Sequence, residues 1–582
     1  MGTGRDGAPA TDVADALRLL GKENLAFGIQ DPSFPSRAED DIGRGSPYAE
    51  GGIELLRYVR ELGFNAVQLG PQGETSLGNR SPYDATLFSR STLSIALRPL
   101  VEAGLLDRAS LDRIVAARPR GDCVHHAYVV GAMARALGEA HRAFARAGDG
   151  RRLDDFARAS AAWLDADAAV EDDPALFRFG QMVAHEQHAA LRARIAPWGL
   201  KLFGDLQIGF STRDEATYGR LFLSDYRMGA PPSRTNPDGQ PWGFPVFDPS
   251  MRAGEVAAFL RRRVGKLLDE FDGLRIDHPH GLVCPWVYRA SDPDPLRAVG
   301  QGARLFESPD LPDHPALGPM AIARSAQLDR TVPRYADRWV RELDDAQVER
   351  YAELFDVVVA CAASRGRRAA DVVCEVLSTQ PYPLERVLAR HGLGRFRVMQ
   401  KAKPDDPSDV YRSDNARPHD WIMLGNHDTD PIWRVVRRWR ERGVTESWAR
   451  YLAGRLLPGS PEPSRAAFVR RLVEDERRMV EALFADLFVS EARNVFVFFS
   501  DLFGYDDVYN VPGVVNDTNW TLRVRPSWRR EYPEMADRGE ALHLPRALAL
   551  ALRARSTRGD GAPHEALVAR LETSPAHPAS HP

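Results

Sequence analysis

The chain has 582 residues, of which 43% are hydrophobic and 27% are charged, a composition ordinary for a globular protein. Its formal net charge of −4 gives no electrostatic reason to expect nucleic acid or a membrane surface as a partner. The four cysteines lack metal-ligand spacing, and neither a signal-like start nor an apolar run of membrane length is present. We therefore expect a cytoplasmic protein with reduced cysteines.

Short apolar segments bounded by Gly, Pro, Asp or Asn alternate with longer helical patterns, which is typical of parallel βαβ units. Eight such segments are predicted as strands: 24–30, 65–70, 200–209, 272–277, 371–377, 395–400, 421–426 and 494–502. A short apolar segment can also be part of a buried helix, so the number of segments is a weak signal by itself. Eight parallel strands predict an α/β fold, a (β/α)8 TIM barrel with its chemistry at the strands' C-terminal ends.

The spacing of these segments predicts the domain organisation. We expect a barrel over residues 21–556, preceded by a tail at 1–20 and followed by a partly disordered, Pro- and Ser-rich tail at 557–582. Residues 72–199 are too many for a barrel loop, and their apolar spacing predicts a largely helical insertion. Two smaller insertions are expected at 210–255 and 284–336.

Three carboxylates follow predicted strands: Asp277, Glu375 and Asp428. In a barrel they would meet in one bowl, where a pair about 5 to 5.5 Å apart can cleave a glycosidic bond with retention. One carboxylate then acts as nucleophile and the other as the acid on the leaving oxygen. A carboxylate at a strand end is also often a helix cap or an ion-pair partner, but three at the same end make that reading weaker.

The neighbours of these carboxylates predict their charge states. Arg275 shares a strand face with Asp277 and is expected to keep it ionised and oriented. Glu375 stands in the apolar stretch "VVCEVL", where burial is expected to raise its pKa, as a general acid requires. His278 and His427 are as well explained by structural hydrogen bonding as by function.

No metal or organic cofactor is expected. The stretch "HEQH" at 185–188 has its histidines three apart rather than four, so we interpret it as an exposed helix face and not as a zinc site. Phosphate-binding and dinucleotide-binding loops are also missing from the sequence.

Seven segments, in chain order, resemble the motifs of one enzyme family. They are "SPYDATLFS" (81–89), "LFGDLQI", "GQPWGFPVF" (239–247), "RIDHPHG", "CEVLS", "GNHDTD" and "NVPGVVNDTNW" (510–520). The chain thus resembles the amylomaltases, or 4-α-glucanotransferases (disproportionating enzymes, glycoside hydrolase family 77), relatives of the α-amylases, from about residue 24 to about residue 525.

The resemblance implies a retaining 4-α-glucanotransferase that moves α-1,4-glucan segments to the 4-hydroxyl of glucose or a maltooligosaccharide. It implies that Asp277 is the nucleophile, Glu375 the acid/base and Asp428 a stabiliser of the transition state, with the 210–255 insertion over the glucan groove. The implied substrate-binding residues are Arg275, His278, His427, Tyr83, Asp205, Trp242 and Trp286. For the tryptophans, packing in a core is an equally good explanation, and for Asp205 a structural hydrogen-bonding role is at least as good.

The sequence departs from the family pattern at four positions near these residues: Val376, Ser378, Phe244 and His280. Such changes bear on acceptor choice and pH optimum more than on the chemistry, since all three carboxylates are present. Two alternatives stay open: a hydrolase of α-1,4-glucans, or a catalytically impaired relative that binds glucan.

Overall fold

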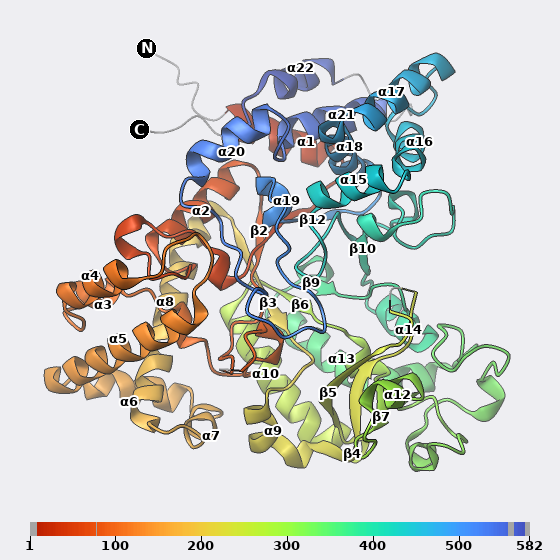
Figure 1. The fold of residues 1–582 in the computed structure, drawn as a ribbon. Helices are drawn as coiled ribbons and strands as arrows, with labels where there is room; N and C mark the ends of the chain where they lie inside the picture. Colours follow the sequence, from red (N-terminus) through yellow and green to blue (C-terminus); the bar gives the residue numbers. More distant parts are fainter. Residues whose placement is uncertain (1–7, 77, 235, 557–563, 577–582) are drawn as a thin grey trace.

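The structure is a computed structural model that describes residues 8–76, 78–234, 236–556 and 564–576. Its centre is a sheet of eight parallel strands that curls into a nearly closed barrel, with the helices packed around it (Figure 1). The strand order is β10-β11-β12-β1-β2-β3-β6-β9. The strands are β1 (Asn24–Gly28), β2 (Ala66–Gln68), β3 (Lys201–Leu206), β6 (Gly273–Ile276), β9 (Val372–Cys374), β10 (Phe396–Val398), β11 (Trp421–Met423) and β12 (Asn494–Phe498).

Each strand falls inside one of the eight predicted segments, which confirms the predicted barrel. The strands are mostly apolar and almost wholly buried, because parallel strands in a barrel are covered on both faces. Glycines let large rings fill the space between neighbouring strands. A Cβ on Gly273 of β6 would lie 2.4 Å from the ring of Phe203 in β3, and one on Gly204 would lie 2.6 Å from Phe271.

The long segment between β2 and β3 is largely helical. Its helices are α3 (Arg98–Glu102), α4 (Arg108–Ala117), α5 (His126–Ala147), α6 (Gly150–Ala159), α7 (Leu164–Ala168) and α8 (Pro174–Ile195). Their apolar faces form a second hydrophobic cluster, separate from the barrel core. The "HEQH" stretch lies on α8, and His188 is only 2% exposed there, so its interpretation as an exposed helix face was wrong. Burial was missed because the three-residue spacing of these histidines is equally compatible with an inward face.

The two smaller insertions build one sheet together. It has the order β5-β4-β7-β8 and antiparallel pairing, with β4 (Phe222–Ala230) and β5 (Gln240–Phe247) from one insertion and β7 (Trp286–Arg289) and β8 (Ala303–Arg304) from the other. Within the insertion at 210–255, β4 and β5 form a hairpin. Short helices flank this sheet: α9 (Thr212–Tyr218), α11 (His280–Val283) and α12 (Pro295–Gly300).

The remaining helices follow the barrel strands. They are α2 (Glu50–Glu61), α10 (Ala257–Glu270), α13 (Asp345–Ala363), α14 (Tyr382–Arg390), α15 (Ile432–Glu441), α16 (Thr445–Leu456), α17 (Glu462–Glu474), α18 (Glu476–Val489), α19 (Phe499–Phe503), α20 (Trp528–Asp537) and α21 (Leu544–Ser556). In the part of the chain that the structure describes, no helix combines the length and apolarity needed to cross a membrane.

Both segments expected as tails contain helices. Helix α1 (Ala8–Leu19) packs against α21 and α22 (Glu565–Thr573), as Figure 1 shows. Arg570 of α22 holds Asp12 of α1 with nitrogen to oxygen distances of 2.8 to 3.0 Å. Residues 1–7, 557–563 and 577–582 of the expected tails lie outside the described residues.

Candidate active site

The predicted site residues come together because parallel strands end at the same edge of the barrel. Asp205 and Arg275 are paired across β3 and β6. Asp277 follows β6 and Glu375 follows β9, and each continues the ladder: Asp277 N donates to Leu206 O, and Glu375 N donates to Ile276 O, both at 3.0 Å. The backbone thus places both carboxyl groups at the mouth of the barrel. Asp428 joins them from the loop after β11.

Arg275 lies between three carboxylates. Its Nη1 is 2.6 Å from Asp205 Oδ2, and its Nη2 is 2.6 Å from Glu375 Oε2 and 3.2 Å from Asp277 Oδ1. The guanidinium is 3% exposed, so these charges interact with little screening. Arg275 therefore organises the whole cluster, whereas the sequence had predicted an interaction with Asp277 alone.

The carboxyl groups of Asp277 and Glu375 interact with each other, and their pKa values shift in opposite directions. Burial raises the pKa of Asp277 well above its usual value, against the opposing charge of Arg275. Burial also acts to raise the pKa of Glu375, but Arg275 and the interaction with Asp277 outweigh it and lower that pKa. The sequence predicted the opposite directions, because the close contact of Arg275 with Glu375 is not visible in sequence.

Asp428 stays ionised although its side chain is partly covered. Burial acts to raise its pKa, but His427, with Nε2 at 3.4 Å, and a 2.7 Å hydrogen bond from Asn510 Nδ2 lower that pKa to about 2. Asn510 belongs to the "NVPG" motif, yet its role as a partner of Asp428 was not predicted. The motif pointed to the segment but gave no reason to choose this side chain.

Aromatic side chains pack together beside the carboxylates. The ring of Tyr83 stacks on His427 with centroids 4.9 Å apart, and Trp520 lies 6.0 Å from His427. Tyr83 also donates to Asp205 Oδ2 at 3.3 Å. Because Asp205 is 2% exposed and bonded to Tyr83, Arg275 and Gln68, its position favours the structural role over direct sugar contact. Trp520 was not among the predicted site residues, although the "NDTNW" motif contains it.

The hairpin β4–β5 brings Trp242 to the same place. The ring of His278 meets Trp242 edge to face at 4.7 Å and stacks on His280 at 4.3 Å. His278 has a φ of 40°, a backbone conformation that a residue with a side chain adopts only when its surroundings hold it there. Burial lowers its pKa to about 4, so this imidazole is neutral at pH 7.

Trp286 is the one predicted site residue that the structure places elsewhere. It is 1% exposed, it packs with Tyr288 and Val299 in the core of the four-stranded sheet, and its Nε1 donates to Val299 O at 2.9 Å. The prediction that Trp286 contacts the groove was therefore wrong, and the packing alternative describes it. An aromatic residue packed in a core and an aromatic residue that lines a groove cannot be distinguished by their sequence pattern.

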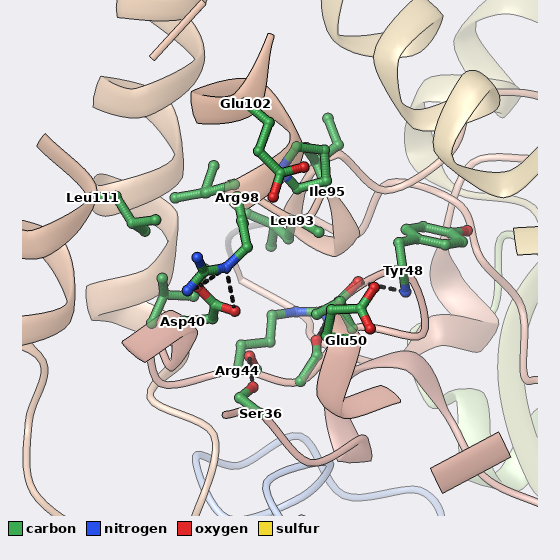
Figure 2. A pocket seen from close by; sticks show the side chains of 17 residues that line it. Ser36, Asp40, Arg44, Tyr48, Glu50, Leu93, Ile95, Arg98, Glu102 and Leu111 are labelled. Carbon is green, nitrogen blue, oxygen red and sulfur yellow. Dashed lines mark hydrogen bonds and ion pairs between the residues drawn. The ribbon is translucent and has the colours of Figure 1, made fainter. Parts of the chain in front are cut away.

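A separate cavity of about 60 Å³ lies between the start of α2 and the segment that leads to α4 (Figure 2). Arg98 crosses it and bonds to both oxygens of Asp40, at 2.8 and 2.9 Å. Arg44 also lines the cavity, and its guanidinium donates a hydrogen bond to Gly45 O at 3.0 Å. None of the predicted site residues lines this cavity, so the candidate active site is the one at the strand ends.

A barrel whose strand ends hold a pair of adjacent carboxyl groups, here Asp277 and Glu375, has the groups that cleavage or transfer of a glycosidic bond requires. The sequence model of the 4-alpha-glucanotransferase family, glycoside hydrolase family 77, matches residues 166–528. Since this is more than half of the sequence, the chain belongs to that family.

Individual relatives agree with this assignment. The 4-alpha-glucanotransferase of Thermus thermophilus is 24% identical over 458 residues, which cover 70% of this chain and 80% of the relative. That of Aquifex aeolicus is 27% identical over 289 residues, 41% of this chain and 58% of the relative. Among solved structures, an amylomaltase from Streptococcus agalactiae in complex with acarbose aligns over 93% of this chain and 100% of its own, with a TM-score of 0.67 at 18% identity. The amylomaltase of Corynebacterium glutamicum aligns over 91% of this chain and 76% of its own, with a TM-score of 0.63 at 19% identity. Identities this low show a shared fold.

Proposed function

We propose that the chain is a retaining 4-α-glucanotransferase that transfers α-1,4-glucan segments to the 4-hydroxyl of glucose or a maltooligosaccharide. Family membership supports the reaction class. The observation that carries the mechanism is the pair of carboxyl groups, Asp277 and Glu375, which both contact Nη2 of Arg275, at 3.2 and 2.6 Å. A retaining reaction needs one ionised and one protonated carboxyl group in such a pair.

The pKa directions, raised at Asp277 and lowered at Glu375, are the reverse of what catalysis requires. Attack requires Asp277 as carboxylate and Glu375 as acid, so substrate binding must reverse these directions. Retaining pairs stand about 5 to 5.5 Å apart, further than a hydrogen bond, so a sugar that enters the site separates the two groups. Arg275 contacts both with the same nitrogen, Nη2, and it favours the ionised form of whichever carboxyl group it stays with.

Transfer then proceeds in two steps. The Asp277 carboxylate attacks the anomeric carbon, the glycosidic bond breaks, and the Glu375 proton goes to the leaving oxygen. In the second step Glu375 takes the proton of the acceptor hydroxyl, whose oxygen displaces Asp277 from the anomeric carbon. Asp428, ionised and fixed by Asn510, accepts hydrogen bonds from sugar hydroxyls as the ring distorts.

Substrate binding would use the aromatic groups around the carboxylates. Tyr83 and Trp242 offer faces to the apolar side of sugar rings, and His278 and His427 offer polar edges to the hydroxyls. The hairpin that carries Trp242 would cover the groove. By covering it, the hairpin would favour an ordered acceptor over water, and so transfer over hydrolysis.

The test is incubation of the purified protein with maltotriose, followed by oligosaccharide profiling and a glucose assay. We expect a ladder of longer glucans plus glucose, and its loss by about three orders of magnitude or more in Asp277→Asn, which lacks the nucleophile. Asp225→Asn, the same change at an exposed position, is the control and should keep the ladder. Net release of reducing ends without longer products would show a hydrolase, and unchanged maltotriose would refute the proposed enzyme.

A further inference from the structure

Two imidazole rings stack beside the catalytic carboxyl groups. His280, the first residue of α11, lies against His278 with ring centroids 4.3 Å apart and an angle of 22° between the planes. Trp242 meets the same His278 ring edge to face at 4.7 Å. The ring of His278, whose backbone is strained, is thus held by contacts from two different segments.

His280 also connects two catalytic loops. Its Nε2 lies 3.0 Å from the carbonyl oxygen of Thr379, four residues beyond Glu375. Since a carbonyl oxygen can only accept, Nε2 must carry the proton of this hydrogen bond. The bond therefore ties the loop after β6, which holds Asp277, to the loop after β9, which holds Glu375.

The other ring nitrogen shows that His280 is neutral. Its Nδ1 is buried and has no hydrogen-bond partner among the described residues. A second proton would place an unpaired charged donor in a buried position near Arg304, Arg395 and His278, the ionisable groups that act on this ring. Burial is the largest cause that lowers the pKa of His280 well below its usual value, and the bond to Thr379 opposes it only in part.

We propose that His280 is a positioning residue for the glucanotransferase reaction, with its ring fixing His278 against the bound sugar and its Nε2–H fixing the loop of Glu375. The proposal rests on the proposed function and assigns separate roles to two parts of the His280 side chain. The face of the ring serves binding, and the hydrogen bond serves the acid/base step.

Two substitutions separate these roles. His280→Phe keeps a ring for His278 but removes the donor to Thr379, so we expect kcat on maltotriose to fall about tenfold or more with KM within about twofold. The pH dependence of kcat should also shift, because Glu375 is no longer fixed relative to Asp277 and Arg275. His280→Gln keeps an N–H at a similar reach but removes the ring, so KM should rise about fivefold or more with kcat within about twofold.

His314 offers a matched control. It is also 4% exposed, and its Nε2 also lies 3.0 Å from a backbone carbonyl oxygen, that of Gln301. His314→Phe and His314→Gln should leave kcat and KM within about twofold of the wild type. The proposal is overturned if the His280 variants change kcat and KM together, if they change neither, or if the His314 variants behave in the same way.

A spectroscopic test does not depend on activity. In protein labelled with ¹⁵N-histidine, the signal that His280→Phe removes should be a neutral imidazole with its proton on Nε2 from about pH 5 to pH 8. The His278 signal should move in His280→Gln and stay in His280→Phe. A His280 ring that titrates in this range, or a His278 signal indifferent to His280→Gln, overturns the proposal. If these signals behave as expected but maltotriose is not converted, the proposed function fails, and so does the catalytic part of this proposal.

Discussion

Asp428 is partly exposed, with a side-chain accessibility of 39%, and two neighbours outweigh the cost of its partial burial and keep it ionised. The imidazole of His427 lies 3.4 Å from one carboxylate oxygen, and the amide of Asn510 donates to the other at 2.7 Å. The resulting pKa of about 2 lies below the value of about 3.9 for the unfolded chain. The ionised carboxylate therefore stabilises the fold above about pH 4, and this contribution is lost as the pH falls toward 2.

The lowered pKa of Asp428 leads to a prediction for Asp428→Asn. Between about pH 6 and about pH 3.5, linkage removes less than about 0.7 kcal/mol of unfolding free energy from the wild type through this residue, because its side chain is 39% exposed and solvent screens its interactions. The asparagine variant lacks the titrating group, so its loss over the same interval should be smaller by that amount. Urea unfolding at the two pH values measures the difference; an equal loss in both proteins would contradict a depressed pKa.

Individual residues also show which features of the site could be predicted from the sequence and which could not. The position of Asp277, Glu375 and Asp428 at strand ends was predicted because strand direction alone determines it. The directions of their pKa shifts were not, since the sequence does not show that Nη2 of Arg275 lies 2.6 Å from Glu375 and 3.2 Å from Asp277. Trp286 was misplaced for a related reason: apolarity shows that a ring is covered, but not by what.

Among the secondary-structure elements, the hairpin β4–β5 has the clearest tie to the site. It pairs with β7 from the other insertion, so two segments predicted separately support each other. Sequence periodicity shows that such strands exist but not that they pair across about 50 residues, because pairing of this kind depends on the folded barrel between them. The sheet gives Trp242 a fixed support beside His278.

We predict that Trp242→Ala weakens glucan binding more than it slows the chemistry. The loss of an aromatic face costs about 1 to 2 kcal/mol, or about a five- to thirtyfold rise in KM for maltotriose, with kcat within about threefold. Trp198→Ala, at a half-buried tryptophan after α8, serves as the comparison and should leave KM unchanged. A fall in kcat without a change in KM would instead assign Trp242 to the positioning of catalytic groups.

At the scale of the whole molecule, the two ends of the barrel have different tasks. The carboxyl ends of the strands carry the candidate active site. Helix α1 ends at Leu19, shortly before β1 begins at Asn24, and therefore lies at the amino end of the barrel, where it packs with α21 and α22. The sequence predicted tails there, and local composition does not reveal that helices α1 and α22 pack together.

This separation predicts that damage at α1 affects stability and not the reaction. Ala16 of α1 is fully buried, so Ala16→Glu forces an unpaired carboxylate into the buried face of α1 and should lower the unfolding free energy by about 3 kcal/mol. Arg18→Glu changes charge on the same helix at a side chain that is 73% exposed, and should cost less than about 0.5 kcal/mol. Below their unfolding temperatures both variants should convert maltotriose with the wild-type kcat and KM, because the amino end of a barrel contributes stability while the carboxyl end binds substrate. A change in KM for Ala16→Glu, measured where it is folded by circular dichroism, would show that the two ends are coupled.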